Sequence, residues 1–145
     1  MSTIADLNPD GVFAAQLDKK VVVHTAKDVF HTIRVYKYGI QPNVGVDDEF
    51  VVVRKYGTTS TKLTRLGLPN GQIAVTVYCK MQTNGTFKEN RISEIISQIE
   101  ESANSKKYGN YFYEIEADNI MQDTTPEPTS GYSTTAINVW WEKRN

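Results

Sequence analysis

Hydrophobic and polar residues alternate most regularly in the stretch Gln72–Gln82. Every second residue from Ile73 to Met81 is apolar there, and this period of two places those side chains on one face of a β-strand. Three further strands are predicted where β-branched and aromatic residues are concentrated: Val21–Thr25, Val29–Gly39 and Phe50–Gly57. The consecutive apolar residues of the last of these predict burial on both of its faces.

A different period follows in the stretch Thr86–Ala103. Four isoleucines recur there at the spacing i, i+3, i+4 and i+7, which forms one apolar stripe on a helix: Ile92, Ile95, Ile96 and Ile99. The opposite face carries Arg91, Glu94, Gln98 and Glu101. Thr86 and Glu89 match a capping box, which predicts that the helix begins beside Thr86. The residues Ala103–Asn110 are expected to end it.

The last part of the chain predicts a long hairpin. Tyr111–Asp123 is expected to be a strand, Thr124–Gly131 an exposed irregular tip, and the remaining residues a closing strand. Ile137, Val139 and Trp141 would point to one face of that strand, and Asn138 and Trp140 to the other. One tryptophan therefore belongs to the core, and the other would be exposed unless a neighbouring molecule covers it.

Turn residues separate these elements. Ile40–Glu49 is predicted to be a loop, and the polar connection Thr58–Gly71 is expected to end in a turn at Pro69-Asn70-Gly71. Pro9-Asp10-Gly11 also predicts a turn, followed by a short helix around Val12–Asp18. The whole pattern predicts a single α+β domain over residues 1–145, with an N-terminal arm or short helix (1–20) and a core (21–143). In that core, a mainly antiparallel sheet is covered on one face by the amphipathic helix of about residues 86–103.

Composition narrows the classes of function. The chain has 145 residues, 39% of them hydrophobic, and a formal net charge of -1. This charge argues against binding nucleic acid through bulk positive charge. The single cysteine, Cys79, forms no internal disulfide, which favours folding in a reducing cytoplasm. No apolar run reaches the length of a membrane span, and the first residues show no export signal.

Each group of residues capable of chemistry is explained at least as well by a structural role as by a catalytic or metal-binding one. His24 and His31 would face each other across a hairpin, but a metal needs a further ligand, such as Cys79 or Asp28. Cys79 lies on the apolar face of its strand, which favours a buried structural thiol. Asp47-Asp48-Glu49, Glu100-Glu101, and Glu114 with Glu116 form acidic groups that a solvated edge or an interface wall explains. We therefore expect no enzyme activity, cofactor or metal.

Two binding surfaces are weaker candidates. Basic residues near Tyr56 would suit single-stranded nucleic acid: Arg54, Lys55, Lys62 and Arg65. The connection that contains Lys62 lacks the spacing of a phosphate-binding loop. One tryptophan, either Trp140 or Trp141, could join a platform of tyrosines that stacks on sugars: Tyr108, Tyr111, Tyr113 and Tyr132.

The order of elements resembles the tail terminator proteins of long-tailed bacteriophages. Similar patterns are the strand and helix in "GQIAVTVYCKM…NRISEIISQIEE" and the terminal hairpin "YFYEIEADNIMQDTTPEPTSGYSTTAINVWWEK". The resemblance covers about residues 29–143. The earlier residues depart from it, because family members often begin with a longer amphipathic helix.

The resemblance implies a structural virion protein that is assembled in the cytoplasm of the host bacterium. Such proteins form a closed ring, often of six copies, that ends the tail tube and joins it to neck proteins of the head, with DNA passing through the lumen. The candidate subunit interface is Trp140, Asn138 and Tyr132, with the strand edge Val21–Thr25. The candidate contacts to tube or neck are Lys62, Arg65, Leu66, Thr124 and Glu127. The candidate lumen residues are Glu114 and Glu116.

Three alternatives stay open. The first is another connector or neck ring, for example a twelve-fold one, from a short-tailed phage. The second is a monomeric module that binds sugar or single-stranded nucleic acid through Trp140 or Tyr56. The third is a small enzyme whose site the sequence does not display.

Overall fold

The computed structural model describes residues 8–18, 20–26, 29–37, 49–59, 69–115, 120–126 and 131–144. Within these residues, two helices and nine strands follow one another: α1 (Pro9–Leu17), β1 (Val22–Ala26), β2 (Val29–Thr32), β3 (Arg34–Lys37), β4 (Glu49–Thr59), β5 (Asn70–Lys80), α2 (Glu89–Ala103), β6 (Lys106–Tyr108), β7 (Tyr111–Glu114), β8 (Ile120–Pro126) and β9 (Tyr132–Lys143).

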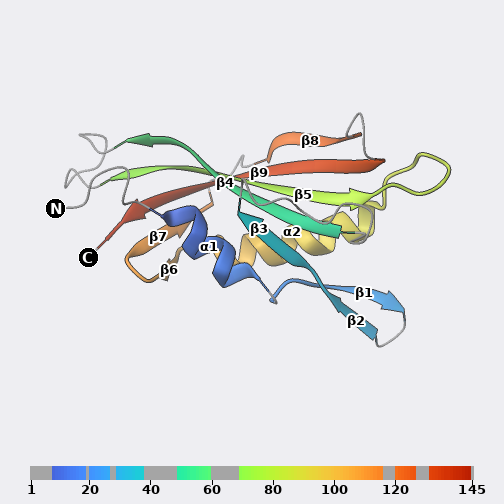
Figure 1. The fold of residues 1–145 in the computed structure, drawn as a ribbon, viewed down its shortest axis with the longest axis horizontal. Helices are drawn as coiled ribbons and strands as arrows, with labels where there is room; N and C mark the ends of the chain where they lie inside the picture. Colours follow the sequence, from blue (N-terminus) through green and yellow to red (C-terminus); the bar gives the residue numbers. More distant parts are fainter. Residues whose placement is uncertain are drawn as a thin grey trace.

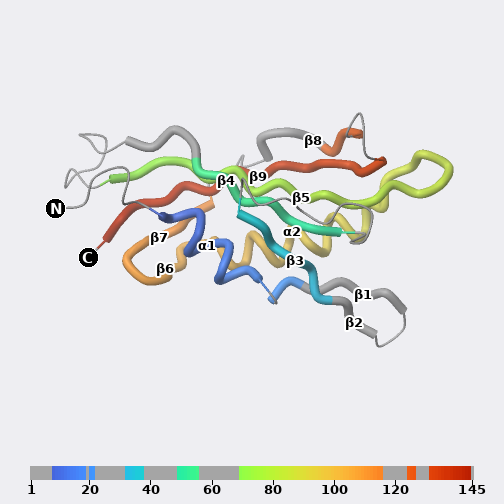
Figure 2. The backbone as a smooth tube through the Cα atoms, in the orientation of Figure 1, coloured from blue at the N-terminus to red at the C-terminus, as the bar shows by residue number. Residues whose placement is uncertain are grey.

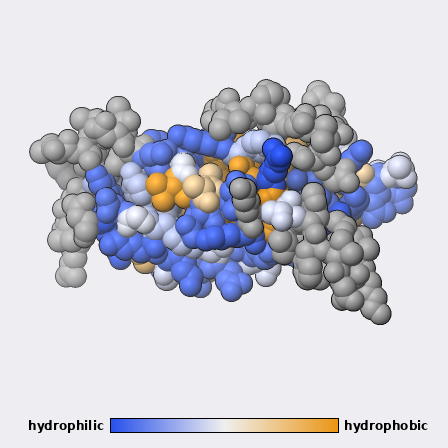
Figure 3. Space-filling model, turned by 60° about the horizontal axis from the view of Figure 1, so that its bottom comes forward, coloured by the Kyte–Doolittle hydropathy of each residue, from blue (hydrophilic) through white to orange (hydrophobic). Residues whose placement is uncertain are grey.

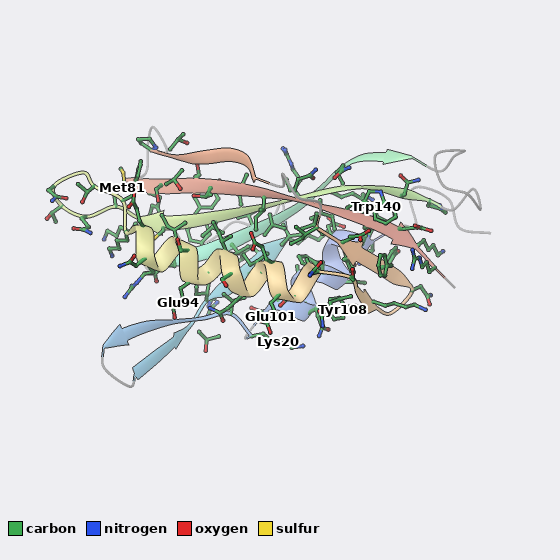
Figure 4. All side chains as sticks on the ribbon, turned by 180° about the vertical axis from the view of Figure 1, so that it is seen from behind. Lys20, Met81, Glu94, Glu101, Tyr108 and Trp140 are labelled. Atoms are coloured by element: carbon green, nitrogen blue, oxygen red, sulfur yellow. The ribbon has the colours of Figure 1, made fainter. Side chains whose placement is uncertain are left out.

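Seven of the strands form one sheet in the order β3-β4-β5-β9-β7-β6, and β8 also pairs with β9. All of these pairs are antiparallel except β3 with β4. The sheet is strongly twisted, and both helices lie on the same side of its central strands β4, β5 and β9 (Figures 1 and 4). The predicted α+β class, with a mainly antiparallel sheet, is confirmed.

The core lies between the inner face of the sheet and the two helices. Alternate residues of each central strand are fully or almost fully buried there: Val51 and Val53 on β4, Ile73, Val75 and Val77 on β5, and Ile137, Val139 and Trp141 on β9. Phe13 and Leu17 of α1 pack against this face beside Ile95 and Ile99 of α2. The outside of the helix-bearing side is mostly hydrophilic, with a small hydrophobic area towards its middle (Figure 3).

The helix α2 confirms the predicted apolar stripe but begins later than expected. Ile92, Ile95 and Ile99 are buried, and Ile96 is half-buried. The helix begins at Glu89, and Lys88 at its N-cap position makes no side-chain capping hydrogen bond. The capping-box prediction is therefore wrong. Its Thr86 is engaged elsewhere, because its backbone N–H and its hydroxyl both donate to the side-chain oxygen of Asn84.

The predicted short helix near the N-terminus is α1, and it starts three residues earlier than expected. Pro9, Asp10 and Gly11 form its first turn rather than a separate turn, because proline at the first helical position loses no intrahelical hydrogen bond. Tyrosines of β7 hold this helix to the sheet. The Tyr113 hydroxyl donates to the Pro9 carbonyl at 2.6 Å, and the Asn8 N–H donates to the Tyr111 hydroxyl oxygen at 3.0 Å.

Burial raises the pKa of the Tyr113 phenol well above its ordinary value, and the nearby Tyr111 and Asp10 raise it further. The folded state therefore keeps a proton that the unfolded chain loses above about pH 10. The stability linked to Tyr113 is fully present below that pH and is lost as the pH rises. Tyr113→Phe should cost about 1 kcal/mol at neutral pH and should flatten the alkaline loss, as measured by urea unfolding across pH. An equally steep alkaline loss in the variant would contradict this assignment.

Two predicted strands are each divided in the structure. Val29–Gly39 breaks at the fully buried Ile33, whose N–H donates to the Val21 carbonyl. The part before the break, β2, pairs with β1 in a separate two-stranded sheet, and the part after it, β3, joins the main sheet. Tyr111–Asp123 separates into β7 and β8, which pair with opposite halves of β9. Bulges within the β8–β9 pair shift its register.

One predicted turn and one predicted helix end are also corrected. Asn70 and Gly71 are the first residues of β5, not a turn, because they pair with Glu142 and Trp141 of β9 and both are buried. The segment Ala103–Asn110, expected to be only a helix end, contains β6, which pairs with β7. Of the predicted loop Ile40–Glu49, only Glu49 lies within the described residues, where it begins β4.

Candidate assembly surfaces

The alternation predicted for the closing strand is confirmed. Trp141 is fully buried in the core, whereas Asn138 and Trp140 are half-buried on the outer face of the sheet, away from the helices. Trp140 lies towards the C-terminal end of β9, far from the exposed side of α2 that carries Glu94 and Glu101 (Figure 4). Trp140 is thus less exposed in the isolated chain than the sequence suggests.

Neighbouring side chains explain why Trp140 is partly covered. Its cross-strand partners are Gln72 on β5 and Glu114 on β7. The Phe112 ring meets the indole edge-on, with ring centroids 6.4 Å apart. The Arg144 guanidinium carbon lies 3.9 Å from the centre of the Phe112 ring, a cation–π geometry. We call this group, which combines two aromatic rings with a cation and a carboxylate, the Trp140 patch: Phe112, Glu114, Asn138, Trp140 and Arg144.

Tyr132, the third candidate for the subunit interface, is not available at the surface. It is only 2% exposed, and its ring centroid lies 5.5 Å from that of Phe50. Phe50 in turn stacks on Tyr78 at 4.6 Å. Tyr132 therefore belongs to an aromatic cluster within the subunit, and its assignment to a subunit contact is corrected.

Thr124 is also misplaced by the sequence prediction. It lies within β8 rather than at an exposed hairpin tip, and it is half-buried. Its hydroxyl is 2.7 Å from that of Thr135 on β9, so it serves strand pairing. The other candidates for contact with tube or neck lie outside the described residues: Lys62, Arg65, Leu66 and Glu127.

The tyrosine platform predicted for sugar stacking is not formed. Tyr111 and Tyr113 are buried on the inner face of the sheet, and Tyr132 is buried on the outer face. Tyr113 packs against Phe13, with ring centroids 4.9 Å apart. Trp140 and the buried tyrosines of β7 therefore cannot share a surface, because they lie on opposite faces of the sheet.

The acidic candidates separate into different environments. Glu114 is exposed at the end of β7, and Glu100 and Glu101 are exposed on α2. The prediction that Glu49 lies on a solvated edge is wrong. Its side chain is 1% exposed and forms an ion pair with Arg91 of α2. Glu116, Asp47 and Asp48 lie outside the described residues.

The candidate metal and thiol residues do not converge on a site. His24 pairs in register with Phe30 and His31 with Val23, so the two histidines are not opposite each other in the β1–β2 hairpin. Cys79 is buried within the sheet, as predicted. Among the described residues no group of three His, Cys, Asp or Glu side chains is placed to hold a metal ion.

The end of the sheet at β3 is a surface that the sequence did not suggest. In the described part of the chain, β3 has β4 as its one strand neighbour. The Val35 N–H points away from β4 and donates to the Asp18 carboxylate at 3.3 Å. A hollow of about 410 Å³ runs beside it, lined by Asp18, Thr32, Ile33, Arg34, Val35 and Tyr36. The edge predicted at Val21–Thr25 instead belongs to β1, in the separate hairpin.

Comparison with known proteins assigns no family. No protein-family model matches the sequence, and no curated protein matches it. Within the described residues, no helix is both long enough and apolar enough to cross a membrane.

Proposed function

We propose that this chain is a structural subunit of a closed homo-oligomeric ring at the neck of a bacteriophage tail, where the ring ends the tail tube and joins it to the head. The observation that carries the proposal is the Trp140 patch. A half-buried tryptophan beside a phenylalanine and an arginine combines the residue types that are enriched at the centres of protein interfaces. The order of strands, helix and terminal hairpin supports the phage role.

The two ends of the sheet also suit a ring. One end is β3, and the other is formed by β6 together with β8. These ends differ in sequence and in strand length, so a contact between them would be head-to-tail rather than self-complementary. Head-to-tail contacts generate closed rings when the rotation between subunits closes.

The placement of Glu114 follows from the same proposal. Glu114 and Trp140 are direct cross-strand neighbours on the outer face. If Trp140 lies at the subunit interface, its neighbour Glu114 lies at the rim of that interface. Glu114 can face the lumen only if this rim borders the lumen. Glu114 thus stays a candidate lumen residue, at the rim of the proposed interface.

Replacing Trp140 should abolish ring assembly without unfolding the subunit. Trp140→Ser removes the largest apolar surface of the patch, and interface tryptophans often contribute about 2 kcal/mol or more to binding. The measurement is light scattering and negative-stain microscopy over a concentration series, with and without tail-tube and neck proteins. Phe112→Ser should act in the same way.

Tyr78→Ser is the matched control. It also removes a half-buried aromatic side chain from β5, but within the Phe50 cluster and outside the Trp140 patch. Rings should persist in this variant, and their symmetry distinguishes a six-fold tail ring from a twelve-fold connector. Rings that survive Trp140→Ser but not Tyr78→Ser would contradict the assigned interface.

A second function, a monomeric module that binds sugar through Trp140, is favoured by one observation. The side-chain oxygen of Gln72, the cross-strand partner of Trp140, is buried and has no hydrogen-bond partner among the described residues. Sugar sites combine an aromatic face with polar side chains that fix orientation. Titration of oligosaccharides against the fluorescence of the Trp141→Phe variant, in which Trp140 is the sole tryptophan, tests this function. A saturable change in a strict monomer would favour it over the ring.

A further inference from the structure

The turn between β5 and α2 contains an Asn-Gly pair that the function proposed above does not use. Asn84 and Gly85 are both exposed. The turn projects beyond the end of the strands (Figure 2), just after Met81, which Figure 4 labels. Gly85 has a φ of 82°, which is costly for a residue with a side chain, and nothing lies within 4 Å of the position that a Cβ would occupy.

Hydrogen bonds hold the Asn84 side chain over the peptide that follows it. Its oxygen accepts the Thr86 N–H at 3.1 Å and the Thr86 hydroxyl at 2.7 Å. The first of these bonds closes an Asx-turn. The ring of that turn contains both the side-chain carbonyl carbon of Asn84 and the backbone nitrogen of Gly85, so the two atoms are kept close together. The Gly85 N–H donates to the Gln82 carbonyl at 2.9 Å.

We propose that Asn84 is a site of spontaneous deamidation, catalysed by its own turn. The Gly85 N–H first leaves its hydrogen bond to the Gln82 carbonyl. The nitrogen then loses its proton to base in the solvent and attacks the side-chain carbonyl carbon of Asn84. The bond from that carbon to the side-chain nitrogen then breaks, and the nitrogen takes up a proton from the solvent and leaves as ammonia. Water opens the resulting succinimide at either of its carbonyls and gives aspartate or isoaspartate. No oxidant or metal is needed.

The turn accelerates this reaction in two ways. The Asx-turn holds the attacking and attacked atoms together, so less conformational entropy is lost on reaction. The two donors of Thr86 point at the oxygen on which negative charge develops during attack, which is the arrangement of an oxyanion hole. The absence of a side chain on Gly85 leaves the approach of its nitrogen unobstructed.

The second Asn-Gly pair of the chain provides an internal control. Asn70 and Gly71 are buried and lie within β5, where they pair in register with Glu142 and Trp141. The extended strand holds the Asn70 side chain away from the following nitrogen, and burial excludes the base and the water that the reaction consumes. The same dipeptide is therefore expected to react at one position and to persist at the other.

The modification changes both charge and backbone. Each event lowers the formal net charge from -1 by one further unit. Isoaspartate also inserts a methylene group into the main chain, which disrupts the Gln82–Thr86 and Gly85–Gln82 backbone hydrogen bonds of the turn. The negative charge arises close to the start of α2, where a helix stabilises anions, so the helix itself should persist.

The experiment incubates the purified full chain at mildly alkaline pH and follows each asparagine by peptide mass mapping, with enzymatic methylation to detect isoaspartate. Asn84 should convert first, its rate should rise with pH, and Asn70 should remain intact while the protein is folded. Thr86→Val removes the hydroxyl donor and should slow the reaction about fivefold. Thr86→Ser keeps that donor and should retain the rate.

Three outcomes would overturn the proposal. The first is conversion of Asn70 at the rate of Asn84 in the folded chain. The second is faster conversion at another exposed asparagine, such as Asn104. The third is equal rates in the Val and Ser variants of Thr86, which would assign the reaction to exposure alone. In denaturant, Asn84 and Asn70 should deamidate at equal rates. Rates that still differ would mean that the neighbouring sequence, and not the folded turn, determines which asparagine reacts.

Discussion

Replacing Trp141 with alanine should cause one of the two largest losses of stability predicted for this protein. The side chain is fully buried on the inner face of the sheet, and its ring meets that of Tyr111 edge-on at 5.8 Å. Truncating a buried tryptophan costs about 3 to 5 kcal/mol, because apolar contact is lost and a cavity remains. That loss is a large share of the stability of a small domain, about 5 to 15 kcal/mol. Urea unfolding followed by circular dichroism measures it.

Two variants keep this prediction testable if Trp141→Ala fails to fold. The indole nitrogen of Trp141 is buried and has no hydrogen-bond partner among the described residues. Trp141→Phe therefore removes an unpaired donor as well as volume, and it should cost only about 1 to 2 kcal/mol. Trp140→Ala, on the outer face, should cost about 1 kcal/mol. A larger loss at Trp140 than at Trp141 would show that the two tryptophans are assigned to the wrong faces.

The difference between these tryptophans could be predicted because it depends on a local period. Adjacent residues of a strand point to opposite faces, and Ile137 and Val139 identify the face that is buried. The isoleucine stripe of α2 is equally local, since residues three or four apart share a helix face. Where one short-range pattern determines burial, the sequence was sufficient to place both elements.

Competing hydrogen bonds and long-range packing explain the failures. Thr86 and Glu89 satisfy the sequence pattern of a capping box. The side-chain oxygen of Asn84, however, accepts both the N–H and the hydroxyl of Thr86. Tyr132 lies on the outer face of the sheet, as its place in the alternation requires, yet it is buried against Phe50. That contact joins residues far apart along the chain, and no local period encodes it. The division of Tyr111–Asp123 depends likewise on how β9 pairs with each half.

The Glu49–Arg91 ion pair is the clearest feature that the sequence concealed. Glu49 follows two aspartates, and Arg91 lies among the polar residues of α2, so each was expected to face solvent. The structure joins them across 42 positions of the chain. The pair links the first residue of β4 to the first turn of α2, and the Glu49 carboxylate is 1% exposed. A carboxylate so deeply buried requires a partner, because desolvating an isolated charge is costly.

Removing Arg91 should therefore be far more damaging than its half-buried position suggests. Arg91→Met keeps most of the side-chain length but leaves the Glu49 carboxylate buried without its cation, and breaking a buried pair in this way costs about 3 to 5 kcal/mol. We expect the lower end of that range, about 3 kcal/mol, because the Arg91 side chain is 23% exposed and solvent screens part of the interaction. Urea unfolding measures the loss. Hydrogen exchange should show it in the first turn of α2.

The double-mutant cycle separates the buried charge from the lost contact. Glu49→Gln removes the charge but keeps the shape, and Arg91 can turn towards solvent, so this change should cost only about 1 kcal/mol. Glu49→Gln/Arg91→Met should then be more stable than Arg91→Met alone, because no buried charge remains unpaired. Losses that simply add in the double variant would contradict this account. Such additivity would mean that packing, rather than the charges of Glu49 and Arg91, holds the start of β4 to the start of α2.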